Sequence, residues 1–280
     1  MSDIKAGDLV IKPVDIDKKC FNQIDMPPFQ HPNLMVGIGH VAAGKTTHMY
    51  NMINIMKPIF GTNILIFSPT LMNDPIGKKM EEEEMYLEHF DNYSIGTLKS
   101  ILKVIKDEHD EYKERTGEDC PEKYLVIFDD ILGTLPNNVM APACKEFNAF
   151  ISTYRHGGGI APEGALSLLF YDQHYKDLNV VIRANTGMVF LLGAHSEKQI
   201  KTYAEEMCAA TGGETDKFME LYHEAKDHNR YDFMTLDMRG LKCYRNFTDE
   251  LYNRDDDKGG KDDEESETEP ETETESDDSD

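Results

Sequence analysis

The stretch that decides the fold reads Leu34-Met35-Val36-Gly37-Ile38-Gly39-His40-Val41-Ala42-Ala43-Gly44-Lys45-Thr46-Thr47. It begins as an apolar run and continues into a loop of the form Gly, four residues, Gly-Lys-Thr. Apolar residues then recur at helical spacing as far as Met56, and Pro58 is expected to end that helix. A strand, this loop and a helix, in this order, are the context in which a phosphate-binding loop occurs.

The residue types in this loop are those that binding of a triphosphate requires. Gly39 and Gly44 let the backbone curl so that successive N–H groups face an anion, and the following helix adds the positive end of its dipole. Lys45 is expected to reach the β- and γ-phosphates, and the Thr46 hydroxyl is expected to ligate Mg²⁺. The sequence therefore predicts a nucleoside triphosphate site, with ATP and Mg²⁺ as its ligands. The residues expected to bind the nucleotide are Gly39, His40, Val41, Ala42, Ala43, Gly44, Lys45, Thr46 and Thr47.

The charge of the chain is concentrated at its C-terminal end. The 280 residues carry a net charge of −24, and residues 255–280 contribute −13 of it through 15 acidic residues and two lysines. This segment has no apolar residue to bury, so we expect a disordered acidic tail. Three interpretations of the tail stay open: a solubilising appendage, a tether for basic partners, and a mimic of nucleic acid.

The remainder of the chain is expected to hold an N-terminal extension at residues 1–24 and one P-loop ATPase domain at residues 25–254. The five cysteines are odd in number and show no Cys-x-x-Cys spacing, which favours reduced thiols and argues against a zinc site. The first residues lack the apolar core of a signal peptide, and no stretch reaches the ~18 apolar residues of a membrane span. We expect a protein that is neither secreted nor embedded in a membrane.

Apolar runs alternate with helical stretches through this domain. Strands are expected at Asn33–Ile38, Asn63–Phe67, Tyr124–Phe128, Ser167–Tyr171 and Met188–Leu192, with a less apolar one at Tyr231–Leu236. Besides the helix after the loop, helices are expected at 98–115, Cys144–Ser152, Glu197–Cys208 and Asp216–Ala225. Strands separated by helices indicate right-handed crossovers, and hence a three-layer α/β fold whose mainly parallel central sheet is flanked by helices. Ligands of such sheets bind beyond the carboxyl ends of the strands.

An acidic pair, Asp129-Asp130, follows the strand at Tyr124–Phe128. An apolar strand that delivers a carboxylate at its C-terminal edge is typical of the second half of an NTPase site. We expect Asp129 to hold the Mg²⁺ that Thr46 also holds, and Asp130 to polarise the attacking water. Such a pair also opens turns or caps helices, so this assignment depends on the phosphate loop upstream.

Two further positions are candidates for catalysis. Gln173 follows the next strand and is expected to bond the γ-phosphate or orient water, the alternative being a surface turn amide. Arg155 lies beside three consecutive glycines and is our candidate for an arginine inserted into a neighbouring subunit's site, as in NTPases that work as rings. Arg183 is the reserve, and either arginine is alternatively a plain surface residue.

The ordered motifs of the chain resemble those of the genome-packaging ATPases of large DNA viruses, virophages and Polinton-type self-synthesising transposons, the viral branch of the FtsK–HerA superfamily. The motifs are Gly39–Thr46, Ser68-Pro69-Thr70, Asp129-Asp130, Arg155-His156, Gln173 and Ile182-Arg183-Ala184-Asn185. Leu221–Ala225 and Tyr231–Met234 are similar to the family's C-terminal end, so that the resemblance extends over residues 25–240. The phosphate loop is common to many families, whereas the ordered set is far more specific.

This resemblance implies a P-loop NTPase of the ASCE, RecA-like type that pumps double-stranded DNA into a preformed capsid as a ring of identical subunits. It also implies capsid or portal-vertex proteins as partners, and a location in the host cytoplasm, the viral factory or the virion. Two features depart from the family pattern: a bulky loop interior, His40–Ala43, and the acidic tail. Residues 1–254 carry −11, so DNA contacts are expected to be few and confined to basic residues of a central pore.

Other classes of protein fit the sequence less well. A regulatory GTPase would use Asp130-Ile131-Leu132-Gly133 as its DxxG element, but no Asn-Lys-x-Asp element follows. A nucleotide kinase would need an arginine-rich lid, and the arginines are scattered. A helicase, a DNA-partition ATPase and a nucleotide-binding assembly scaffold without DNA pumping remain as alternatives to packaging.

Overall fold

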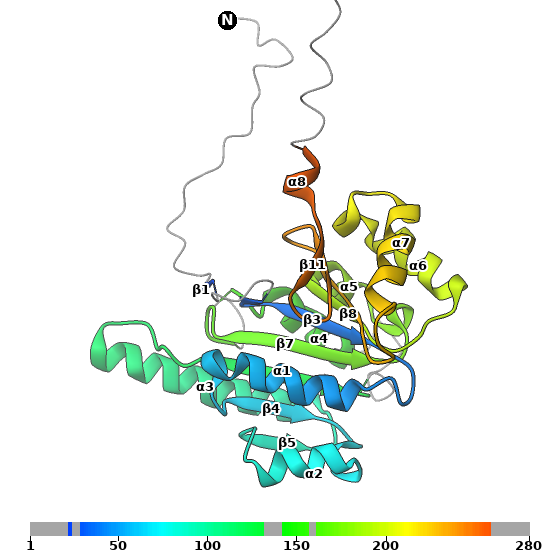
Figure 1. Cartoon of the computed structure of the whole chain (residues 1–280). Helices are drawn as coiled ribbons and strands as arrows, with labels where there is room; N and C mark the ends of the chain where they lie inside the picture. Colours follow the sequence, from blue (N-terminus) through cyan, green and yellow to red (C-terminus); the bar gives the residue numbers. More distant parts are fainter. Residues whose placement is uncertain (1–21, 24–28, 132–141, 157–160, 259–280) are drawn as a thin grey trace, which may run out of the picture.

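The computed structural model describes residues 22–23, 29–131, 142–156 and 161–258 (Figure 1). Its centre is a nine-stranded sheet with the order β11-β10-β9-β8-β3-β7-β6-β4-β5. The strands are β3 (Leu34–Ile38), β4 (Ile64–Phe67), β5 (Glu88–Phe90), β6 (Tyr124–Asp129), β7 (Leu166–Asp172), β8 (Met188–Leu191), β9 (Met234–Asp237), β10 (Lys242–Arg245) and β11 (Asp249–Asn253). A separate two-stranded ladder joins β1 (Asn22–Gln23) to β2 (Gln30–His31).

Neighbouring strands from β8 to β5 run parallel, whereas β9, β10 and β11 form an antiparallel edge next to β8. Strand β7 lies between β3, which leads into the phosphate loop, and β6, which carries Asp129. This order brings the carboxyl ends of β3, β7 and β6 side by side at one edge of the sheet. The predicted fold class, a three-layer α/β P-loop NTPase with a mainly parallel sheet, is confirmed.

Helices cover both faces of the sheet. They are α1 (Lys45–Phe60), α2 (Pro75–Glu82), α3 (Ile95–Thr116), α4 (Pro142–Thr153), α5 (Val180–Asn185), α6 (Glu197–Met207), α7 (Thr215–Lys226) and the terminal α8 (Arg254–Lys258). One core layer packs α1 and α2 against the sheet, and α1 is seen in front of the strands in Figure 1. Helices α3 to α7 share the other core layer with the opposite face. Within the described residues, no helix has the length and apolar character that crossing a membrane requires.

The packing of β3 against β7 explains a glycine in the middle of a buried strand. A Cβ at Gly37 would lie 2.5 Å from Cε1 of Tyr171, whose fully buried ring crosses that position. The two residues are also paired in the register of the parallel ladder. The missing side chain therefore makes room for an aromatic ring directly below the phosphate loop.

Most expected elements lie where the sequence placed them, with differences at their ends. The prediction that Pro58 ends α1 is wrong, because the helix continues to Phe60 and closes at Gly61, whose N–H donates to the Lys57 carbonyl. Near the last turn a proline removes only one hydrogen bond, which the buried face of the helix outweighs. Strand β9 begins at Met234, three residues later than expected. Elements β5, β10, β11, α2 and α5 were not predicted.

The proposed domain boundaries stay predictions. Residues 255–258 of the expected tail form part of α8, and residues 259–280 lie outside the described residues. The same is true of residues 1–21 and 24–28, and of Leu132 and Gly133 in the weighed DxxG element.

Candidate nucleotide-binding site

The loop between β3 and α1 has the backbone that the glycines were expected to allow. Gly44 adopts φ +87° immediately before α1, in the left-handed region that suits glycine. Gly39 is packed so tightly that a Cβ there would lie 2.8 Å from the Ala43 Cβ and 3.0 Å from the Leu192 Cβ. Its N–H donates to the Asp172 carbonyl over 3.0 Å, which ties the loop to the end of β7.

A cavity of about 370 Å³ lies over this loop and brings the two halves of the expected site together. Predicted residues that line it are His40, Val41, Ala42, Gly44, Lys45, Thr46, Thr47, Asp129, Asp130 and Gln173. Gly39 and Ala43 lie in the loop but are not part of the lining. Lys45 and Asp129, 84 positions apart in the sequence, therefore face one cavity at the rim of the sheet. The functional roles of these residues stay predictions.

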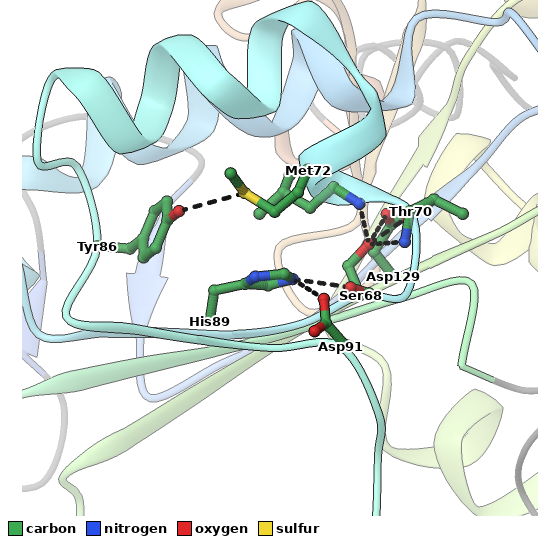
Figure 2. Close-up of polar contacts among 8 residues, drawn as sticks. Ser68, Thr70, Met72, Tyr86, His89, Asp91 and Asp129 are labelled. Atoms are coloured by element: carbon green, nitrogen blue, oxygen red, sulfur yellow. Dashed lines mark hydrogen bonds and ion pairs between the residues drawn. The ribbon is translucent and has the colours of Figure 1, made fainter.

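Asp129 is the most deeply buried carboxylate of the cavity, with 5% of its surface exposed. Burial raises its pKa to about 6, and the neighbouring Asp130 adds to the rise. The Ser68 hydroxyl donates to Oδ2 over 2.8 Å (Figure 2) and opposes this effect. The positive charge of Lys45 also lowers the pKa. The charged form of Asp129 is thus costly in the ligand-free protein, and a cation beside it would relieve that cost.

Ser68 is itself held by the backbone that follows β4. Its Oγ accepts the N–H of Leu71 at 3.2 Å, and its carbonyl accepts Nε2–H of His89 at 2.8 Å (Figure 2). Its side chain is fully buried, so the hydroxyl that supports Asp129 has a fixed position. The sequence placed Ser68 in a motif but assigned it no role; a serine directly after a buried strand was the signal available.

Asp130 and Gln173 face the cavity from the carboxyl ends of the neighbouring strands β6 and β7. Asp130 has φ +51°, a left-handed conformation that aspartate tolerates better than most residues. The Gln173 N–H donates to Oδ1 of Asp172 at 2.6 Å, which fixes the backbone at the tip of β7. Both positions suit groups that contact a γ-phosphate or an attacking water. The same cavity is also lined by Thr70, Asp74 and Tyr231, to which the sequence assigned no role.

Lys45 begins α1, and its Nζ donates to the Gly39 carbonyl over 3.0 Å. The ammonium therefore lies across the phosphate loop, and the residue lines the cavity. This position lets it exchange the carbonyl for phosphate oxygens without leaving the cavity.

The bulkiest residue of the loop interior, His40, has a structural explanation. The His40 ring centroid lies 5.5 Å from those of His174 and His195, so three imidazoles from separate segments pack together. His195 is anchored to α7, because its Nδ1 lies 3.0 Å from the Tyr222 hydroxyl. Burial, followed by the charge of His40, lowers the pKa of His195 to about 4, which keeps this ring neutral at pH 7. The histidine thus connects the loop to the C-terminal helices.

Neither arginine candidate reaches this chain's own cavity. The Arg155 carbonyl accepts the N–H of Gly164, just before the amino end of β7, whereas the cavity lies beyond the carboxyl end of that strand. The Arg183 guanidinium pairs with Glu206 on α6 at 2.5 Å and lies over the Tyr175 ring. An action of either arginine on a triphosphate therefore requires the site of another subunit, and this stays a prediction.

The donor set of the cavity fits Mg²⁺ as part of a nucleotide complex. The Asp129 carboxylate and the Thr46 hydroxyl both face the cavity and are hard oxygen ligands. Among the residues that the structure describes, no cluster of three His, Cys, Asp or Glu side chains would hold a metal alone. Mg²⁺ is commonly bound by one or two protein oxygens together with phosphates and waters, which is the arrangement available here.

Fold and cavity together define the class: an α/β P-loop NTPase fold with its phosphate loop at the rim of the sheet. Solved structures of the genome packaging NTPase B204 from Sulfolobus turreted icosahedral virus 2 share this fold. The AMP complex has a TM-score of 0.51 and 14% sequence identity, covering 76% of this chain and 96% of that one. The sulfate complex has a TM-score of 0.51 and 14% identity, covering 78% of this chain and 96% of that one.

The DNA-packaging ATPase B204 from Sulfolobus turreted icosahedral virus is similar in the same way, with a TM-score of 0.50 and 13% identity. It is matched over 77% of this chain and 97% of its own length. At these identities the likeness shows the fold alone. No protein-family profile and no curated protein matches the sequence.

Proposed function

We propose that the chain is an ATPase that hydrolyses Mg²⁺-bound ATP in the cavity over residues 39–47. The observation that carries this proposal is the convergence of Lys45, Thr46, Asp129, Asp130 and Gln173 on one cavity. These residues supply a phosphate-binding ammonium, two oxygens for a cation, a carboxylate for water and an amide near the γ-phosphate. ATP-analogue complexes of the viral NTPase with the same fold support this proposal.

In this mechanism the protein positions the reactants and balances charge. The loop N–H groups and Lys45 bind the β- and γ-phosphates, and Gln173 holds the γ-phosphate or the water. Asp130 accepts a hydrogen bond from the attacking water and orients it for in-line attack. Bound Mg²⁺, held through Thr46 and Asp129, supplies positive charge that offsets the charge developing on the phosphate oxygens.

The task we propose is translocation of double-stranded DNA during packaging of a viral genome. It is supported by the ordered motifs and by a fold shared with packaging NTPases of two viruses. Arg155 lies away from the cavity of its own subunit. In a ring of identical subunits it would instead act on the site of the neighbouring subunit, so its placement fits such a ring. Capsid or portal proteins as partners, and a location in the host cytoplasm or viral factory, follow from the same proposal.

DNA contacts are expected to be few. Two lysines on α3 that would suit a phosphate backbone are paired with acidic groups: Lys99 with Glu146 at 2.8 Å and Lys106 with Asp110 at 3.3 Å. A moderate salt dependence of DNA affinity is therefore the expected result, and an affinity that does not change with salt would argue against direct phosphate contact.

The experiment that tests the task is phosphate release with and without double-stranded DNA, at several protein concentrations. A translocating ring predicts stimulation by DNA and an oligomer in the presence of ATP and DNA. Equal rates with and without DNA would indicate an ATPase that does not pump DNA, and absence of hydrolysis would favour an assembly scaffold.

A mixture of Arg155→Ala subunits with Lys45→Ala subunits tests whether Arg155 acts on the site of a neighbouring subunit. Partial rescue of hydrolysis supports this action, and no complementation contradicts it.

A further inference from the structure

Several side chains of the cavity have no role in the chemistry proposed above, and Tyr231 is the large aromatic one among them. Tyr231 lies between α7 and β9, lines the cavity and has 72% of its surface exposed. A singly exposed ring needs no explanation by itself, but this one lines the wall of the cavity that holds the phosphate loop. Because the ring belongs to the cavity wall, part of a bound nucleotide would meet it.

The sheet order indicates that this part is the nucleoside. Met234 at the start of β9 pairs with Leu191 at the end of β8, so the segment before β9 arrives at the edge that holds the phosphate loop. From β3, the carboxylate strand β6 lies on one side, beyond β7, and β9 lies on the other side, beyond β8. A triphosphate whose γ-phosphate points toward Asp129 therefore directs its nucleoside toward Tyr231.

The backbone of Tyr231 is fixed although its ring is exposed. Its N–H donates to Oδ1 of Asn229 at 3.1 Å, and the next residue, Asp232, is buried and accepts a hydrogen bond from Asn246 at 2.9 Å. The Arg230 guanidinium lies 5.7 Å from the ring centroid. An aromatic ring on an anchored backbone, with a cation near one face, is a suitable platform for a planar base on the other face.

We propose that Tyr231 stacks on the base of the bound nucleoside triphosphate. This inference rests on the proposed function, because it assigns the nucleoside end of the same site. Stacking uses the π-face that every base has, so Tyr231 strengthens binding of adenine and guanine nucleotides alike. In this proposal the phosphate loop binds the triphosphate, and the Tyr231 ring adds affinity through its contact with the base.

The test compares binding of AMPPNP and inorganic tripolyphosphate to the full chain by calorimetry. Tyr231→Ala is expected to weaken AMPPNP binding by roughly 5- to 150-fold, the range that one base–aromatic stack supports. Tripolyphosphate has no base, so its affinity should stay within about twofold of the wild type. Tyr231→Phe keeps the ring face and should bind AMPPNP within about threefold of the wild type.

Tyr112→Ala is the matched control, since Tyr112 on α3 also has an arginine beside its ring, Arg115 at 5.6 Å, and lies outside this cavity. It should leave both affinities unchanged. Unchanged AMPPNP binding by Tyr231→Ala overturns the stacking proposal alone, and so does an equal loss for AMPPNP and tripolyphosphate. A wild-type chain that binds neither ligand overturns the proposed function and this inference together.

Discussion

On the β6 side of the phosphate loop, Asp129 is 5% exposed and receives a hydrogen bond from the buried Ser68, whereas on the β9 side Tyr231 is 72% exposed. The first region costs stability, because a buried carboxylate with a raised pKa resists ionisation. The second region, that of Tyr231, costs the fold little stability, because the ring stays in water. The comparison indicates that the carboxylate proposed to hold the cation is buried and held in place, whereas the ring proposed to stack on the base is left accessible.

The largest expected effect is that of Lys45→Ala. Loss of the ammonium removes charge stabilisation at the γ-phosphate, so ATP hydrolysis should fall by roughly 100- to 1,000-fold or more. The melting temperature should change little, because one partly exposed hydrogen bond to a loop carbonyl is lost. Phosphate release and thermal melting measure the two effects. Lys57→Ala on the exposed face of α1 is the control and should retain full activity.

Asp129→Asn should slow ATP hydrolysis and at the same time make the fold more stable. We expect hydrolysis to fall by roughly 100-fold, since the cation loses its charged ligand. The pKa of Asp129 is raised from 3.8 to about 6 in the folded state, so ionisation destabilises the fold as pH rises from about 4 to about 6. Without Mg²⁺ at pH 7.5 the Asn variant should therefore be more stable, by up to about 3 kcal/mol.

The pH dependence provides the control for this gain in stability. Below about pH 4 the carboxyl is protonated in both the folded and the unfolded state, so the difference between Asp129→Asn and the wild type should vanish. Urea titrations at pH 3.5 and pH 7.5 measure the difference in the free energy of unfolding between the two proteins. Equal stability of the two proteins at pH 7.5 would show that burial does not make the ionised form of Asp129 costly.

Ser68→Ala should have an intermediate effect. Removal of the hydroxyl that donates to Asp129 raises the pKa of this carboxyl further above 6, so the acid limb of the ATPase pH profile should move to higher pH. At low Mg²⁺ and pH 7 we expect a loss of roughly tenfold or less. Ser100→Ala, which removes a hydroxyl bonded only to the Gly96 carbonyl of its own helix, should leave the profile unchanged. An unshifted profile for Ser68→Ala would contradict the support that we assign to this residue.

The smallest effect is expected for His40→Ser. This substitution tests whether a side chain of the phosphate loop contacts the nucleotide, as opposed to the loop backbone. In the proposed function, loop N–H groups hold the phosphates, and the His40 ring packs against His174 and His195 instead. AMPPNP affinity should therefore change by about threefold or less. A loss greater than about tenfold would show that the imidazole itself contacts the nucleotide.

The sequence predicted the phosphate loop and the strand before Asp129 because both signals are local. Gly39, Gly44 and Lys45 lie at fixed offsets, and β6 is an apolar run of the expected length. The same pattern gave Gln173 its place at the tip of the neighbouring strand. Parallel order then follows from alternating strands and helices, which is why the sheet class was predictable.

Tertiary contacts determine the features that the sequence left open. The role of Ser68 depends on β4 lying beside β6, and the role of Tyr231 depends on β9 pairing with β8. Short strands such as β5 carry too little apolar patterning to be recognised; His89 there matters through its bond to the Ser68 carbonyl. The continuation of α1 past Pro58 likewise depends on packing rather than on propensity.

The most direct test of the central claim is the Mg²⁺ dependence of AMPPNP binding in the wild type, Lys45→Ala and Asp129→Asn. We predict that Mg²⁺ strengthens binding to the wild type, that Asp129→Asn loses this gain, and that Lys45→Ala binds weakly with or without the cation. Full retention of the Mg²⁺ effect in Asp129→Asn would contradict the account, because the cation would then lie away from the place where Lys45 and Asp129 converge.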